Sequence, residues 1–352
     1  MRTILILCLS ILFLPLTLAA EGLTVTGGEE GTDYSYAENV YTVLTGTALT
    51  FSGTTTADRI VIEEGVTANV TINGLFIDVS SIDYAAAIQL KKQAKLILSL
   101  SGTNEVKSGR DKAGIHLEEN SYLKITAENT SHSLKATGGN NPNSWGKTGS
   151  GIGGCRNDSY EATIEIENGK IEAIGGNGTN YHMGYKGAGI GSDNLKIIFK
   201  GGEVIAKKGN GDYRAKEIED IHGIITVHSG TFDPCSFGGE TSVDDGTFTN
   251  CTFNNVTING GTFTNCPISG DKAIINKGTI NNTDGSRISS KEIIINGGNI
   301  TVSMPNSNSD NAIGDQDCNV TINGGTIIAT ANGINSSGDP SGAGIAGTVT
   351  IN

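Results

Sequence analysis

Short stretches of sequence recur along this chain. NVTING at 69–74 returns as NVTINGGTF at 255–263 and as NVTINGGTI at 319–327. Looser copies keep the same alternation of apolar and polar residues, followed by Asn-Gly or Gly-Gly, as in IEIENGKI at 164–171 and IIINGGNI at 293–300. Self-similarity at a period of tens of residues is typical of solenoids, in which each repeat packs against its neighbours. The sequence therefore predicts a repeat fold built from strands.

The shared register of the copies favours parallel stacking over a series of hairpins. Asn-Gly alone usually indicates a β-hairpin. Three consecutive copies, however, place Cys235, Cys251 and Cys266 five residues after the Gly of GTF, and hairpins would reverse the chain at every copy. We expect an all-β fold, a single parallel β-helix that is right-handed because parallel crossovers favour that hand. One interior column is expected to contain Phe232, Phe248, Phe263, Ile280 and Ile300.

The repeats define the expected coils of this β-helix. Each coil adds about 4.8 Å, so the rod is on the order of 55 Å long. The expected first apolar residues of the coils are Val70, Leu96, Leu123, Ile164, Ile197, Ile225, Thr241, Val256, Ala273, Ile293, Val320 and Val349.

The chain divides into three parts by pattern. Residues 1–20 contain Arg2, then a short apolar run, then small residues where a cleavage site is expected. This order is typical of a secretory signal peptide. Residues 21–57 lack the repeat but alternate like strands, and we expect them to form an N-terminal β cap over the first coil. Residues 58–352 carry the repeats and stop partway into a copy. We therefore expect the rod to continue in a longer protein or to associate end to end through its open last coil.

Charge and hydropathy limit the classes of partner and the location that this chain can have. The formal net charge is -13 and the isoelectric point is about 4.8, so no nucleic acid is expected, because phosphate binding needs a basic face. After the signal peptide no stretch approaches the roughly 18 apolar residues of a transmembrane segment. The sequence predicts a secreted or cell-surface protein.

The cysteines are expected to pack rather than to form disulfides. The three stacked cysteines would point the same way in neighbouring coils, which favours a small apolar ladder over a bridge or a tetrahedral metal site. Five cysteines remain after signal-peptide removal, an odd number for a closed disulfide framework: Cys155, Cys235, Cys251, Cys266 and Cys318.

Inserted loops carry the scarce aromatic residues. The loops at 138–154, 175–192 and 206–224 have related sequences and should project on one side of the solenoid, which is often the binding side. Flat rings on hydrogen-bonding loops hold sugars, and the alternative is that the rings only cover the flank of the rod. The insertions precede a Gly-Ile element in Ala113-Gly114-Ile115, Gly151-Ile152-Gly153, Gly189-Ile190-Gly191, His222-Gly223-Ile224 and Gly344-Ile345-Ala346. The candidate carbohydrate-binding residues are Trp145, Tyr181, His182, Tyr185 and Tyr213.

Acidic clusters are candidates for calcium and for catalysis. Asp310, Asp315 and Asp317 surround an Ile-Gly corner, and calcium takes several carboxylate and carbonyl oxygens. The alternative is that these acids are solvated. A polysaccharide hydrolase needs two facing carboxylates, and a lyase needs an acid cluster with a nearby basic residue. The sequence defines no such groove and no catalytic residues, so an enzyme stays the second hypothesis.

The GAGIG corner followed by ITVxxGT or VTINGGT resembles surface proteins of anaerobic bacteria described as carbohydrate-binding or adhesin-like β-helix proteins. The resemblance covers about residues 58–352. It implies export and a parallel β-helix. Together with the loops it suggests a non-catalytic protein that binds a polysaccharide or a host or cell-surface glycan, or mediates adhesion. The alternative is a β-helical polysaccharide lyase or hydrolase.

Overall fold

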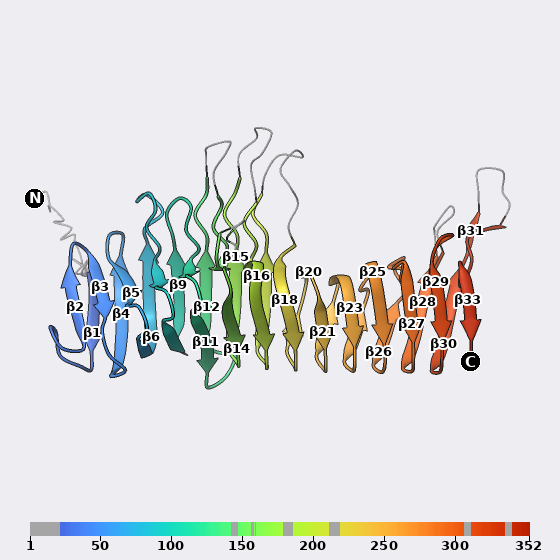
Figure 1. The fold of residues 1–352 in the computed structure, drawn as a ribbon, viewed down its shortest axis with the longest axis horizontal. Helices are drawn as coiled ribbons and strands as arrows, with labels where there is room; N and C mark the ends of the chain where they lie inside the picture. Colours follow the sequence, from blue (N-terminus) through green and yellow to red (C-terminus); the bar gives the residue numbers. More distant parts are fainter. Residues whose placement is uncertain are drawn as a thin grey trace, which may run out of the picture.

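Successive repeats wind into the coils of a parallel β-helix (Figure 1). The structure, a computed structural model, describes residues 22–141, 147–155, 158, 160–178, 186–210, 219–305, 311–334 and 340–352. Within these residues, 31 strands join in one sheet, and every strand pair in it is parallel except two in the N-terminal cap. The all-β parallel β-helix with an N-terminal β cap is thereby confirmed.

Each coil contributes strands to three faces of the rod. Face A is formed by β6 (Thr67–Asp78), β8 (Lys95–Ser101), β11 (Tyr122–Ala127), β14 (Ala162–Ile166), β16 (Ile190–Phe199), β18 (Ile221–Val227), β21 (Thr241–Val243), β23 (Thr252–Ile258), β25 (Ile268–Ile275), β27 (Glu292–Ile295), β29 (Asn319–Ile322) and β33 (Thr348–Ile351). Face B is formed by β9 (Thr103–Lys107), β12 (Ser133–Thr137), β15 (Lys170–Ile174), β17 (Glu203–Lys207), β19 (Thr231–Phe232), β22 (Thr247–Thr249), β24 (Thr262–Thr264), β26 (Thr279–Asn282), β28 (Asn299–Met304) and β30 (Thr326–Ala331). Face C is formed by β5 (Arg59–Ile62), β7 (Ile88–Leu90), β10 (Ile115–Leu117), β13 (Ile152–Gly153), β20 (Ser236–Gly238) and the first residues of β16, β18, β23 and β25.

Antiparallel strands occur at the two ends of the described chain. In the cap, β1 (Gly22–Thr26) pairs with β4 (Ala48–Thr55) and β2 (Tyr34–Ala37) pairs with β3 (Val40–Val43). Strands β3 and β4 also pair in parallel with β5 and β6, so the cap continues directly into the first coil. A separate two-stranded sheet joins β31 (Gly333–Ile334) to β32 (Pro340–Ser341).

The predicted coil register is correct at every start but the first. From Leu96 to Val349, each expected first apolar residue pairs with the next one along face A. Val70 is the error, because it pairs with Leu98, and Ala68 pairs with Leu96. Both Ala68 and Val70 are buried. A shift of two residues keeps the same side chains inside a strand, so the alternation could not separate the two registers.

A second column of apolar residues runs along face C. It contains the Ile of four predicted Gly-Ile elements, but Ile224 does not belong to it. Ile190 pairs with Ile221, whereas Ile224 pairs with Lys196 and is 55% exposed. The aligned residues are Ile60, Ile88, Ile115, Ile152, Ile190, Ile221, Phe237, Phe253, Ile268, Ile288, Ile313 and Ile345.

The expected aromatic column of face B is confirmed. The rings of Phe232 and Phe248 are 5.1 Å apart at an interplanar angle of 4°, and those of Phe248 and Phe263 are 4.7 Å apart at 9°. Ile280 and Ile300 continue the column. The rings from faces B and C also meet edge to face, as Phe248 and Phe253 do at 5.4 Å. Stacked and edge-to-face pairs both suit the ring quadrupole, so the narrow core closes without helices.

Cys155, Cys235, Cys251, Cys266 and Cys318 are free and buried. For Cys235, Cys251 and Cys266 this is what the ladder hypothesis predicts. Cys251 and Cys266 each direct Sγ to the carbonyl of a Phe in the preceding coil, at 3.4 and 3.5 Å. In the next coil the buried Asn282 side chain contacts the Cys266 backbone. This side chain accepts from the Cys266 N–H at 2.8 Å and donates to the Cys266 carbonyl at 2.7 Å, so its buried amide is paired.

An asparagine ladder lines the corner between faces A and B. Asn276, Asn296, Asn323 and Asn352 each donate a side-chain hydrogen bond to the Oδ1 of the preceding asparagine at 2.6–2.8 Å. Asn259, the first asparagine of the ladder, donates from its side chain to the Asp244 carboxylate at 3.1 Å. The repeated Asn of the sequence pattern therefore connects coils as well as forming corners.

Replacing Thr241 by valine is expected to stabilise the protein by about 1 kcal/mol. The Thr241 Oγ1 is buried and has no hydrogen-bond partner, and an unsatisfied buried hydroxyl costs about 1–3 kcal/mol. The urea midpoint should rise. Thr257→Val is the control, because the Thr257 side chain lies on the outer side of face A and its replacement should shift stability by less than about 0.5 kcal/mol. A lower midpoint for Thr241→Val contradicts the assignment.

Candidate functional site

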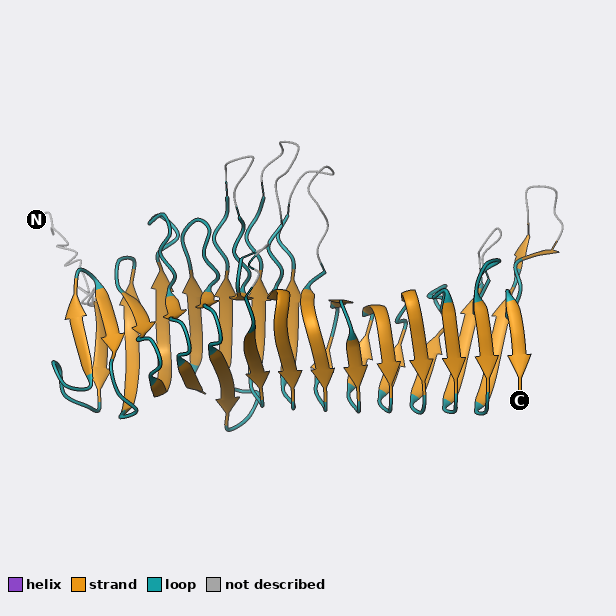
Figure 2. Cartoon of the chain, in the orientation of Figure 1, coloured by secondary structure: helices purple, strands orange, loops and turns teal. Residues whose placement is uncertain are grey.

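The stems of the inserted loops stack on one another between faces B and C. Figure 2 shows these loops projecting from one side of the rod, as predicted. The N–H groups of Gly139, Gly176 and Gly209 donate to carbonyls of the preceding loop at 2.8–2.9 Å. A Cβ on Gly176 would lie 2.1 Å from the Gly139 carbonyl oxygen, and one on Gly209 would lie 1.9 Å from the Gly176 oxygen. Glycine is therefore required for this approach.

None of the predicted sugar-binding residues lies within the described structure. Trp145, Tyr181, His182, Tyr185 and Tyr213 belong to segments outside the described residues. The structure places the stems that carry them, at one corner of consecutive coils. Their role in binding stays a prediction.

Tyr84 is an exposed aromatic residue beside these loops that the sequence analysis missed. Its side chain is 56% exposed and lies against the Arg110 guanidinium, 4.7 Å from the ring centre. The Tyr84 hydroxyl accepts from Arg110 Nη2 at 2.8 Å, and Arg110 also pairs with Asp83 at 2.8 Å. The sequence contains one indication of this site, because Tyr84 lies just before Ile88, which belongs to the face C column. No glycine precedes Ile88, so the Gly-Ile pattern did not identify this corner or its tyrosine.

A polar hollow of 410 Å³ lies over face C next to the loop stems. Its base includes His116 of β10, which points outward and pairs in register with Gly153 of β13. Lys112 and Lys147 line it from the loop stems, and Cys155, Asp158 and Tyr160 line it from the segment that follows β13. We call it the His116 hollow.

His116 is buried with one ring nitrogen unpaired. Its Nε2 lies 3.2 Å from Lys112 Nζ. A charged ammonium group has no lone pair, so Nε2 accepts and the imidazole proton lies on Nδ1. This Nδ1 has no partner, although the residue is only 5% exposed. Burial first, and then the charge of Lys112, lower the pKa of His116 from 6.5 to about 3.

Asp158 organises the other side of the His116 hollow. Its carboxylate accepts from Lys147 Nζ at 2.6 Å, from the Cys155 N–H at 2.7 Å and from the Tyr160 hydroxyl at 2.9 Å. Burial raises the pKa of the Cys155 thiol to about 12, and burial together with Asp158 raises the pKa of Tyr160. The imidazole, thiol and phenol are therefore neutral near pH 7, and the fixed charges come from the lysines and aspartates.

The predicted calcium ligands are only partly placed. Asp315 accepts from the Asn311 side chain at 3.4 Å and lies 3.6 Å from Arg287, and Asp317 is exposed. Asp310 lies outside the described residues. Among the residues that the structure describes, no three His, Cys, Asp or Glu side chains gather as a metal site needs. A calcium site here stays a prediction that depends on Asp310.

The described part of the chain contains no helix with the length and apolarity of a bilayer span. Comparisons of the chain with protein-family models, with curated proteins and with solved structures find no match.

The low pKa of His116 predicts a loss of stability in acid. Because the folded-state pKa lies below the ordinary 6.5, the neutral imidazole is favoured by the fold. This stability is present above pH 6.5 and is lost as the pH falls towards 3. By pH 4.5 the loss from this group should reach roughly 2–3 kcal/mol.

His116→Gln removes this titration. Urea unfolding at pH 7 and at pH 4.5 should show a smaller acid destabilisation in the variant than in the wild type. Equal pH dependence in the two proteins means that His116 is not held neutral.

Proposed function

We propose that this chain is an exported, non-catalytic β-helix protein that binds glycans beside its stacked loops. The observation that carries the proposal is the His116 hollow, which fixed charges of both signs line. Asp111 of this lining directly follows Arg110, which contacts the exposed Tyr84 ring. Sugar sites combine a flat ring with a few fixed polar groups.

The geometry supports binding through two kinds of contact. The Tyr84 ring has Arg110 on it and is still 56% exposed, so it offers an apolar surface for a pyranose ring. Lys112, Lys147 and Asp158 offer donors and acceptors in the adjacent hollow. The Lys147–Asp158 pair, at 2.6 Å, holds two of these groups in place.

A polysaccharide lyase or hydrolase is the second candidate function. Groups with shifted pKa values gather in the His116 hollow, and such clusters are common at active sites. General acid–base catalysis, however, works best with a pKa near the working pH. His116 at about 3 and Cys155 at about 12 are both far from neutrality, which favours binding over proton transfer.

Affinity electrophoresis in gels that contain polysaccharides tests the proposed function. Tyr84→Ala, Trp145→Ala and Tyr181→Ala should each weaken retardation by a glycan that retards the wild type, about 5- to 50-fold for the loss of one stacking ring. Tyr36→Ala is the matched control, because Tyr36 is a 42% exposed tyrosine on the cap strand β2. Retardation that no loop variant changes contradicts the proposal. New unsaturated or reducing ends during incubation would favour the enzyme.

A further inference from the structure

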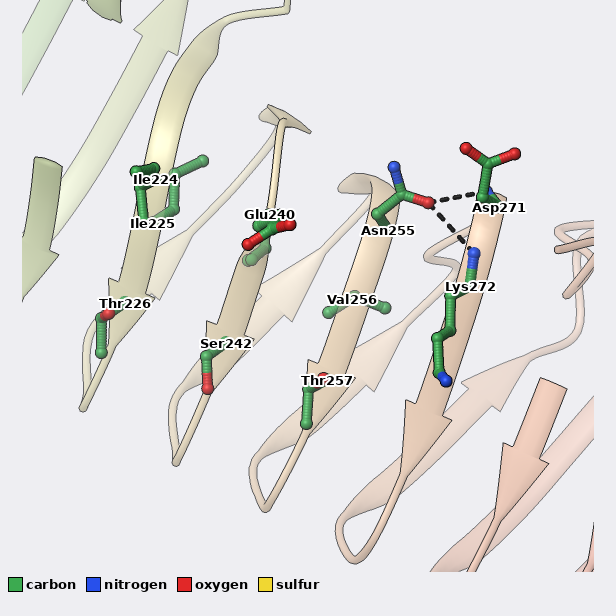
Figure 3. A pocket seen from close by; sticks show the side chains of 11 residues that line it. Ile224, Ile225, Thr226, Glu240, Ser242, Asn255, Val256, Thr257, Asp271 and Lys272 are labelled. Carbon is green, nitrogen blue, oxygen red and sulfur yellow. Dashed lines mark hydrogen bonds between the residues drawn. The ribbon is translucent and has the colours of Figure 1, made fainter. Parts of the chain in front are cut away.

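A groove of 530 Å³ crosses face A over β18, β21, β23 and β25 (Figure 3). The groove begins at Ile224, at the end of the inserted loop at 206–224, and runs over the compact coils between Gly230 and Gly278. It lies on a different face from the His116 hollow and shares no lining residue with it.

Hydroxyl groups repeat along the groove once per coil. Thr226 pairs in register with Ser242, and Ser242 pairs with Thr257. All three side chains are partly exposed on the outer side of the sheet, as Figure 3 shows. Neighbouring strands are about 4.8 Å apart, so these hydroxyls form a row with that spacing along the rod axis.

Apolar groups flank the hydroxyl row. Ile224, exposed by 55%, lies at one end of the groove. Ile274, partly exposed, continues the column after Thr257. A row of hydroxyls with aliphatic side chains beside its ends suits a ligand with apolar faces and many hydroxyls.

The charges at the two ends of the groove differ in their pairing. Asp271 pairs with Lys291 at 2.6 Å and Lys272 pairs with Glu292 at 2.8 Å, so this end is internally neutralised. Glu240 is exposed and makes no ion pair with any described residue. An unpaired carboxylate in a chain of net charge -13 disfavours an acidic ligand.

We propose that the groove binds a linear polysaccharide, uncharged or bearing amino groups, that lies along the rod axis with successive sugar rings over successive coils. Four strands span about 14 Å between the first and the last, which is room for a short run of sugar rings. An extended peptide advances about 3.3 Å per residue and does not match a 4.8 Å row of identical groups. This inference goes beyond the proposed function, because it adds a second site and a ligand class.

The chain offers a matched pair of variants to test it. Thr257 and Thr321 occupy the same outward column, are both partly exposed and lie in identical NVTING segments, but only Thr257 lines the groove. Thr257→Tyr should block the groove, and Thr321→Tyr should leave it open. The thermal midpoints of both variants should be alike, which confirms that they fold.

Binding is measured by isothermal titration calorimetry with oligomers of an uncharged β-glucan, of mannan and of chitosan, and with oligogalacturonate. We expect at least one uncharged or amino-bearing oligomer to bind, with affinity lowered at least 10-fold by Thr257→Tyr and unchanged by Thr321→Tyr. Glu240→Gln should weaken chitosan binding only.

Three results would overturn the proposal. The first is that no uncharged or amino-bearing oligomer binds. The second is that Thr257→Tyr and Thr321→Tyr lower the affinity equally. The third is that oligogalacturonate binds more tightly than the other oligomers. Binding that depends on Tyr84 but not on Thr257 would support the loop site alone and reject the groove.

Discussion

The parallel backbone hydrogen bonds between consecutive coils are the constraint on which the rest of the structure depends. They hold each residue of a coil over its equivalent in the next, so any residue type that recurs in the sequence becomes a column in space. The Phe232, Phe248 and Phe263 rings stack inside the rod for this reason. The corner asparagines bond to one another outside it for the same reason. Both columns add cohesion to bonds that the backbone already makes.

The same constraint shapes the two candidate sites. Where the coils carry insertions, their stems must also stack, and glycines such as Gly176 allow the close approach that this requires. The stacked stems then form one side of the His116 hollow. Where the insertions stop, the next coils are compact and the outer side of face A forms a groove. The change from inserted to compact coils therefore separates a charged hollow from a row of hydroxyls.

Sequence repetition predicted the fold and most of its register, because identical phrases must occupy identical places in a solenoid. The predicted register failed at positions that the repeats do not distinguish. The register of Val70 was wrong by two residues, since alternation has a period of two. The Gly-Ile pattern also matched Gly223-Ile224, which lies on an outward stretch of β18 and not in the face C column.

The His116 hollow could not be predicted from the sequence. His116 and Tyr160 lie in different coils, and Cys155, Asp158 and Tyr160, which line the hollow, have no counterparts in the repeat pattern. The groove was missed for the opposite reason. Its Thr and Ser residues are ordinary members of the repeat, and the repeat pattern does not distinguish them from outward residues elsewhere on face A.

The central claim, that equivalent positions of successive coils lie over one another, is tested most directly by pulsed electron paramagnetic resonance between spin labels along face B. Lys170, Thr247 and Thr326 are exposed, and Thr326 lies seven strand steps from Lys170 and four from Thr247. The account predicts label separations of about 34 and 19 Å, in proportion to the number of coils crossed. Separations that do not increase with the number of coils would contradict it.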